Sequence, residues 1–333
     1  MLQGGRSMKR ELLQVLLKRG ERIAQETLAW AGEQAAGESY TDLASFFAAH
    51  PTLSLPDKLL AGKGDVFVSL HTEEFNGVPH CHDFVEIIYV CRGSVTDCVG
   101  GTRVSLGRGN ACIHNPSSTH FLTDFDGERD VVLNILLSRR FFGKAVYAAA
   151  IRDNKLDGFF NRFLSGGNES FRAFKDLSEA TETIVELLVK ELLRSDGCSA
   201  AVLESILLLL FAELLRNSPK HGEESFAESL ESYLVENLQS ATIESAAATF
   251  GYHPKYFSAL VRKETGRTFR SLLIEQRMKK VESQLLFTDY SIEEIAESVG
   301  YRDAVSLYGN FKSYSGMTPN EFRHGNSKKD GTP

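Results

Sequence analysis

The sequence predicts a multidomain α+β protein. It should have an N-terminal antiparallel β-barrel of the jelly-roll kind, a helical region, and a C-terminal all-α domain of two helix-turn-helix units joined by a linker helix. A helix-turn-helix pattern occurs twice, from Ile243 to Gly266 and from Ile292 to Gly316. Short apolar or alternating runs, several of them separated by glycine turns, occupy Asp65 to Ser138. Leucine-rich helical stretches follow, from Leu177 to Leu193 and from Ala201 to Leu215.

The two C-terminal copies each run from an Ile and an acidic residue through Gly-aromatic to a second helix that ends near a glycine. The second helix of such a unit can enter a DNA major groove. Thr242 and Asp303 are suitable N-caps, and Pro254 suits a first helical position. Ser291 and Glu294 form an S-x-x-E capping box. A tandem pair of these units predicts a DNA-binding module.

Apolar residues between the two units repeat at helical spacing and predict a linker helix. A helix of about 18 residues is roughly 27 Å long. That length suits two recognition helices held about one DNA turn apart, near 34 Å, on one face of the duplex. The repeating residues are Phe269, Leu272, Leu273, Met278, Val281, Leu285 and Leu286.

Thr242 to Arg323 closely resembles the AraC/XylS family of bacterial transcription regulators. The resemblance rests on Gly266 and on the segments LLIEQRMKKVESQLL, SIEEIAESVGY and FKSYSGMTPNEFR. The last segment, with its G-x-T-P close, matches the signature of that family. The resemblance implies a sequence-specific transcription regulator.

In the first recognition helix, Phe257, Leu260 and Val261 form the stripe expected to face the core. The outward residues should then be Lys255, Ser258, Ala259 and Arg262. We expect Lys255 and Ser258 to reach base edges and Ala259 to meet a thymine methyl group. Arg262 is expected at phosphate or in water.

In the second recognition helix, Leu307 and Phe311 should point inward. The expected outward residues are Ala304, Val305, Tyr308 and Gly309, where the family usually has polar side chains. Direct base readout is therefore expected mainly from the first unit. Residues expected to position the second unit on phosphates are Arg302, Ser306 and Lys312, together with the helix N-terminus.

The chain of 333 residues is long enough for two or three domains. Five cysteines without a C-x-x-C pair, and an N-terminus without an apolar signal core, predict a protein of the reduced cytoplasm. The longest apolar run, Ile206 to Ala212, is too short to cross a membrane. Residues 251–333 hold 13 Lys and Arg against 10 Asp and Glu, whereas the whole chain has a net charge of −7. A weakly basic DNA-binding end on an acidic body is expected.

The strand-rich stretch resembles the cupin-like sensor domain that precedes the DNA-binding module in much of the same family. The resembling residues are His80-x-His82-x-x-x-Glu86, Gly93, Gly109 and Pro116-x-x-x-His120. Metal-binding cupins use two His and a Glu from one strand region and a third His from another. The resemblance therefore implies His80, His82, Glu86 and His120 as a ligand set for a divalent metal ion such as Fe, Mn, Ni or Zn.

The alternative is that these four side chains are the polar lining of an organic-ligand pocket. On this interpretation no cofactor is required, and the expected small-molecule site is formed by His80, His82, Glu86, Tyr89 and His120. In an extended strand the first three of these point to one face. The identity of the effector stays open.

The expected domain limits follow the changes of pattern. Residues 1–60 are an N-terminal helical extension, 61–140 the cupin-like barrel, and 141–218 a helical region with a probable dimer interface. Residues 219–224 are a linker, 225–324 the tandem helix-turn-helix domain, and 325–333 a disordered tail.

The sequence thus predicts a non-enzymatic regulator that binds double-stranded promoter DNA and responds to a small molecule. A homodimer is expected, with RNA polymerase as a further partner if the protein is an activator. The competing hypothesis is a metal-dependent cupin enzyme, or a metal sensor, with an attached DNA-binding module. The tandem helix-turn-helix favours the regulator, since catalysis needs no such module.

Overall fold

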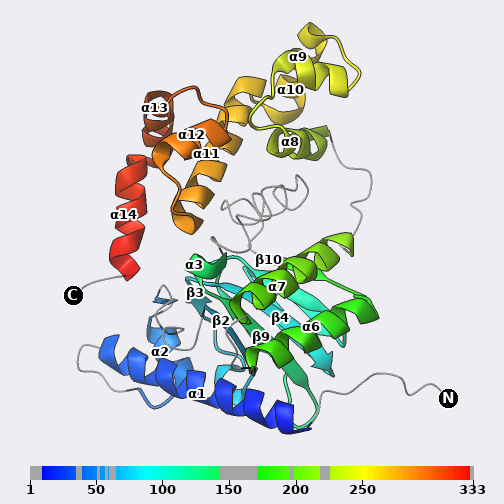
Figure 1. The fold of residues 1–333 in the computed structure, drawn as a ribbon, viewed down its shortest axis with the longest axis vertical. Coiled ribbons are helices and arrows are strands. Elements are labelled where there is room, and N and C mark those ends of the chain that lie inside the picture. The colour runs from blue at the N-terminus through cyan, green and yellow to red at the C-terminus, as the bar shows by residue number, and fades with distance from the viewer. Residues whose placement is uncertain are drawn as a thin grey trace, which may run out of the picture. The chain divides into compact units, whose positions relative to one another are not determined.

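The computed structural model describes residues 10–34, 40–50, 53–56, 59, 65–116, 118–142, 171–194, 199–217 and 226–330. The described residues divide into two compact units, one formed by the chain up to residue 217 and one by the chain from residue 226 (Figure 1). The expected linker at 219–224 lies outside the described residues.

The N-terminal unit contains two larger antiparallel sheets. The first has the strand order β10-β7-β4-β9-β2 and the second the order β6-β5-β8. A short parallel pair joins β1 (Ser54–Leu55) to β3 (Cys81–His82). The strands of the larger sheets are β2 (Val66–Leu70), β4 (Val85–Arg92), β5 (Ser94–Val99), β6 (Thr102–Gly107), β7 (Ala111–His114), β8 (His120–Thr123), β9 (Val131–Leu137) and β10 (Phe171–Phe174). This sheet-rich architecture confirms the expected fold class.

Strand β10 lies beyond residue 140, where the barrel was expected to end. It pairs with β7, with Phe171 opposite His114 and Phe174 opposite Ala111. Four residues are too few to show a strand period by themselves, so only pairing with β7 identifies this segment as a strand.

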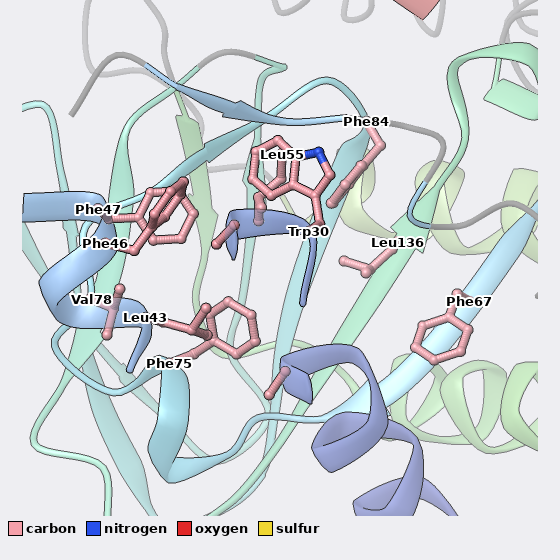
Figure 2. Packing of buried hydrophobic residues seen from close by; sticks show 12 residues of the cluster. Trp30, Leu43, Phe46, Phe47, Leu55, Phe67, Phe75, Val78, Phe84 and Leu136 are labelled. Carbon is pink, nitrogen blue, oxygen red and sulfur yellow. The ribbon is translucent and has the colours of Figure 1, made fainter. Parts of the chain in front are cut away.

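Helices α1 (Arg10–Gln34) and α2 (Leu43–Ala49) belong to the same folded unit as the sheets. Their side chains share one hydrophobic core with strand residues, and Figure 2 shows Trp30, Phe46 and Phe47 in the cluster that also holds Phe75 and Phe84. The short helix η2 (Glu73–Phe75) contributes Phe75. The N-terminal helices are therefore part of the sensor core and are not a separate extension.

Helices α3 (Arg139–Phe141), α6 (Glu179–Leu192) and α7 (Ser199–Arg216) complete this unit. Helices α6 and α7 pack against each other. They leave four large apolar side chains exposed: Leu187, Leu193, Val202 and Leu209. No helix among the described residues is both long and apolar enough to cross a membrane.

The C-terminal unit is wholly helical in its described part. Its helices are α8 (Phe226–Glu236), α9 (Ile243–Thr249), α10 (Pro254–Thr265), α11 (Phe269–Phe287), α12 (Ile292–Ser298), α13 (Ala304–Ser315) and α14 (Pro319–Asp330). The capping box of Ser291 and Glu294 and the N-caps Thr242 and Asp303 are confirmed. Pro254 opens α10 as predicted.

Helix α14 corrects the prediction of a disordered tail from residue 325, because the helix continues to Asp330. Its start is well capped: Glu321 N–H donates to Thr318 Oγ1 at 3.2 Å, and Thr318 N–H donates to Glu321 Oε2 at 2.7 Å. A capped first turn offsets the cost of helix nucleation. Each residue added after that turn, polar or not, contributes one backbone hydrogen bond. Residues 331–333 lie outside the described chain.

Candidate functional site

Helix α10 presents the face that the sequence predicts. Phe257 and Val261 are fully buried in the core of the first helix-turn-helix unit. The residues predicted to face outward are all exposed: Lys255, Ser258, Ala259 and Arg262. The His253 ring caps the helix, since its Nδ1 accepts a hydrogen bond from the Lys255 N–H at 3.3 Å.

Helix α13 confirms part of the prediction and corrects the rest. Leu307 and Phe311 are fully buried, and Val305 is 80% exposed. Ala304 and Tyr308, however, are half-buried and pack against the core of the second unit. The Tyr308 hydroxyl oxygen also accepts a hydrogen bond from Asn320 Nδ2 at 2.7 Å. Neither residue belongs to the outward face, because positions 304 and 308 border the 307/311 stripe on the helix surface.

In the first nine residues of α13 the exposed positions are therefore Val305, Ser306, Gly309 and Lys312, and Arg302 is exposed just before the helix. The Asp303 carboxylate occupies the helix start by accepting the Ser306 N–H at 2.8 Å. A phosphate at this helix N-terminus would meet that carboxylate, so Arg302 and Lys312 are the stronger candidates for phosphate contacts.

Two exposed tyrosines near α10 were missed by the sequence analysis. Tyr256 is 58% exposed and Tyr252 is 41% exposed, and their ring centroids lie 5.4 Å apart. Tyr256 borders the face that carries Lys255 and Ala259. The helical period would not have indicated this, since position 256 lies one turn before Leu260, which was expected to face the core.

The two helix-turn-helix units are tied together by residues outside the recognition helices. Arg277 in α11 donates from Nε to the Leu238 carbonyl at 3.0 Å, and its guanidinium lies 5.3 Å from the Tyr301 ring centroid. Gln239 donates to the Glu297 carbonyl at 3.1 Å. Gly300, at φ +84°, lies so close to Gln239 that an added Cβ would fall 2.5 Å from its carbonyl oxygen. These contacts fix the relative orientation of the units.

The N-terminal unit contains a buried cavity between α1 and the strands. The cavity volume is about 40 Å³. This is more than one water molecule needs. Four predicted residues, His80, His82, Glu86 and His120, line it. Tyr89 does not. Successive β4 side chains alternate between faces, so Glu86 and Ile88 point into the cavity while Tyr89 points to the opposite side.

The carboxylate of Glu86 is the centre of the histidine cluster. His82 Nε2 and His120 Nε2 each lie 3.0 Å from Glu86 Oε2. Burial alone would raise the pKa of Glu86, but hydrogen bonds and charges from the two histidines outweigh it and hold that pKa well below its usual range. Burial lowers the pKa of His80 to about 3 and of His120 to about 4, so both are neutral at pH 7.

The tautomers of three histidines are set by the backbone. His80, His82 and His120 each place Nδ1 near a carbonyl oxygen, of Val78, Phe84 and Ser118, at 2.8, 2.8 and 3.3 Å. A carbonyl only accepts, so Nδ1 carries a proton in each ring. A ring that also donates from Nε2 to Glu86 must be doubly protonated, whereas a neutral ring directs its Nε2 lone pair inward. Metal-bound histidines are commonly oriented in this way.

Ligand atoms of His80, Glu86 and His120 lie within 4.8 Å of one another. Neighbouring ligands of an octahedral ion bound at about 2.1 Å are about 3 Å apart, so the 3.0 Å spacing around Glu86 suits a divalent ion. The donor set of imidazoles and one carboxylate fits the expected transition metals.

A second buried cluster adjoins the first and was missed by the sequence analysis. His114 Nε2 lies 2.8 Å from Asp97 Oδ2 and 3.7 Å from Cys112 Sγ. The His114 and His120 rings stack with centroids 3.9 Å apart. Burial would lower the pKa of His114, but the charge of Asp97 outweighs it and raises that pKa. The β4–β7 register, which sets His114 opposite Glu86, brings the clusters together.

Several polar atoms around the cavity have no hydrogen-bond partner among the described residues. They come from α1, β2, the segment after β2 and β9, and they are Thr27 Oγ1, Ser69 Oγ, His71 Nε2, Thr72 Oγ1 and Asn134 Oδ1. No lysine or arginine lines the cavity in the described part of the chain. Since a buried polar group without a partner is costly, this lining favours a ligand that supplies hydrogen bonds without negative charge.

Comparison with known proteins gives a family assignment for each unit. Residues 66–135 match the AraC-like ligand binding domain, and residues 246–325 match a helix-turn-helix domain. The melibiose operon regulatory protein of Escherichia coli is 22% identical over 258 residues, which cover 73% of this chain and 82% of the relative. The raffinose operon transcriptional regulatory protein RafR of Pediococcus pentosaceus is 29% identical over 129 residues, covering 37% and 47%.

Among solved structures, the C-terminal domain of AraT, a response regulator from Geobacillus stearothermophilus, is 32% identical. The match covers 31% of this chain and 88% of the AraT domain, with a TM-score of 0.29. The two matched domains occur in the order that the sequence predicts, and the melibiose operon regulatory protein matches most of the chain. The chain belongs to the AraC/XylS family: it is an AraC-type transcription regulator with a ligand-binding domain and a helix-turn-helix DNA-binding domain.

Proposed function

We propose that this regulator binds a small, uncharged, hydroxyl-rich molecule in the cavity and transmits its occupancy to promoter DNA bound by α10 and α13. The observation that supports the ligand class is the set of unpartnered polar atoms on a lining without cations. Hydroxyl groups both donate and accept, so one polyol can satisfy Ser69, Thr72, His71 and Asn134 together. The names of the melibiose and raffinose operon regulators add support for a saccharide.

The ligand proposal is tested on the full-length protein with a panel of neutral monosaccharides, sugar acids and sugar phosphates. Isothermal titration should detect binding of a neutral sugar and none of its charged counterpart. Ser69→Ala and Thr27→Val should each weaken that binding, since each removes a hydrogen-bonding group from the lining. The exposed Ser94 on β5 supplies the control Ser94→Ala, which should bind as the wild type does. Tighter binding of the acids would contradict the proposed class.

For the DNA, we propose direct contacts by Lys255, Ser258, Ala259 and Arg262 of α10. We propose further DNA contacts by Val305, Ser306 and Lys312 of α13, and by Arg302 just before that helix. The fragment 225–324 should bind duplex DNA with an affinity that falls steeply as salt rises, because bound cations release counterions. A folded fragment without a salt-sensitive gel shift on DNA upstream of its own gene would refute this.

We also propose that the protein is a cytoplasmic homodimer without enzymatic activity, which contacts RNA polymerase if it activates. Support for a dimer comes from the exposed Leu187, Leu193, Val202 and Leu209 on α6 and α7. Light scattering at micromolar concentration should give twice the monomer mass, and Leu209→Lys should reduce it. A wild-type monomer with and without DNA would contradict the dimer.

A second candidate effector is a divalent metal ion, and the histidine tautomers specifically favour it. The neutral His80 and His120 rings, protonated at Nδ1, present Nε2 lone pairs beside the Glu86 carboxylate, and a cation would stabilise this cluster of electron pairs. Titration of metal-free protein with Zn²⁺, Ni²⁺ and Mn²⁺ should show one site per chain, lost in His120→Ala and retained in His71→Ala. Equal affinity in all three proteins would exclude this site.

A further inference from the structure

Val305 is a large apolar side chain that the protein itself leaves uncovered. The residue is 80% exposed, which is the largest exposed fraction among the large apolar residues of the described chain. It is the second residue of α13, and Lys255 is the second residue of α10. Exposed cationic side chains, Arg302 and Lys312, flank it. An apolar group between cations is poorly suited to a protein core but well suited to a DNA groove, where cations meet phosphate.

Gly309 lies one helical turn after Val305, on the same side of α13. A glycine inside a helix lowers its stability relative to alanine. Nothing in the described chain explains this choice, because an added Cβ at Gly309 would have no described heavy atom within 4 Å. Its backbone is helical, with no positive φ. The absent side chain therefore leaves open space beside Val305 that an outside partner can occupy.

We propose that Val305 and Gly309 form an apolar notch that receives the C5-methyl group of a thymine in the major groove. This inference rests on the proposed DNA binding by α13 and names what that helix reads. Thymine is the one unmodified base with a methyl group at the groove edge, and side-chain methyl groups recognise it by apolar contact. The missing Cβ at Gly309 allows the helix backbone to approach closely. The second unit thus reads a base without a polar side chain.

The test begins with full-length wild-type protein and a library of random duplexes, from which bound sites are selected. Each thymine of the best site is then replaced singly by deoxyuridine, which removes only the methyl group. Fluorescence anisotropy gives the Kd of each duplex. We expect at least one thymine in the half-site of the second unit where deoxyuridine weakens wild-type binding about fourfold, equivalent to about 0.8 kcal/mol for one buried methyl group.

On the Val305→Ala protein the same replacement should cost less than twofold, because the partner of the methyl group is gone. Val305→Thr keeps the shape and one methyl group, and should give an intermediate penalty. Met317→Ala, at an exposed apolar residue just beyond α13, should keep the full wild-type penalty.

The inference is overturned if Val305→Ala retains every wild-type deoxyuridine penalty, or if no thymine shows one. Both results leave DNA binding itself intact, so they are distinct from failure of the proposed function. A wild-type protein that enriches no duplex from the library would instead remove the proposed function and this contact with it.

Discussion

The two helix-turn-helix units share one backbone plan. Helices α10 and α13 are both 12 residues long, and each begins after a side-chain cap. They end at Gly266 and Gly316 with φ of +71° and +78°, a conformation that suits glycine. Each unit buries a pair of apolar residues four positions apart. These matched features are the ones that build the fold.

The outward faces differ at almost every position. Where α10 has the exposed Lys255 and Ala259, α13 has the exposed Val305 and Gly309, and the place of the exposed Ser258 is taken by the half-buried Tyr308. The Tyr308 hydroxyl oxygen accepts a hydrogen bond from Asn320 within the same domain, whereas Ser258 is exposed. Positions that do not pack are free to change chemistry without changing the fold. We therefore propose that one fold carries polar readout in one unit and apolar readout in the other.

The largest effect is expected from Arg277→Ala, which removes the link between the units. Loss of the charged hydrogen bond to Leu238 and of the Tyr301 contact should lower the free energy of unfolding by about 2 kcal/mol. This variant should lose more affinity for DNA sites that need both helix-turn-helix units than for single half-sites. Urea denaturation and anisotropy measure these effects. The exposed Arg270 on the same helix provides the control, and an equal loss of stability in Arg270→Ala would show that Arg277 is not a specific link.

Lys255→Ala should next change which bases the first unit prefers. A good base-edge contact contributes about 1–3 kcal/mol of discrimination, so preference at one base pair should relax. Competition binding against single base-pair variants of a selected site measures the change. Lys263→Ala on the same helix is the matched control, since that lysine pairs with Glu264 at 3.1 Å. A preference that survives Lys255→Ala unchanged would contradict the assigned role.

Gly309→Ala should separate stability from binding. The helix interior gains about 0.5–1 kcal/mol when alanine replaces glycine, so the unfolding free energy should rise. Affinity for thymine-containing sites should fall, because the new Cβ fills the notch. The opposite exchange in the first unit, Ala259→Gly, should lower stability by a similar amount. If Gly309→Ala improves stability and leaves DNA affinity unchanged, Gly309 has no part in close approach.

The smallest effect is expected from Lys312→Ala, which removes one phosphate contact. The slope of log affinity against log salt should flatten by about one unit. Between 50 and 200 mM salt, this amounts to about a threefold smaller loss of affinity. All DNA sequences should be affected equally. A change of base preference in this variant would show that Lys312 contacts bases.

Much of the C-terminal domain could be predicted from sequence because its signals are local. Caps at Thr242, Ser291 and Asp303 need only residues three positions away, and the stripes of Phe257 and Leu307 need only the helical period. The width of a buried stripe is different. Ala304 and Tyr308 are covered through contacts with the rest of the second unit, which the period of α13 does not contain.

The sensor cavity was predicted less completely because it depends on strand register. The resemblance to metal-binding cupins indicated the four ligand candidates His80, His82, Glu86 and His120, and all four line one cavity. Tyr89 was wrongly predicted to line the cavity. It lies three residues after Glu86 in β4, so strand alternation could have placed it on the opposite face. Placing His114 of the Asp97–Cys112–His114 cluster beside Glu86 required knowing that β7 pairs with β4. Likewise, Thr27 and Asn134 line the same cavity only because α1 packs against β2, the neighbour of β9 in the sheet.

We propose that α10 and α13 read different parts of one DNA site by different chemistry. The most direct measurement is selection from randomised duplexes with wild type, Lys255→Ala and Val305→Ala, followed by sequencing. We predict that Lys255→Ala loses preference in one half of the site only, and that Val305→Ala loses a thymine preference in the other half only. Loss in the same half by both variants, or unchanged preference in both, would contradict the account.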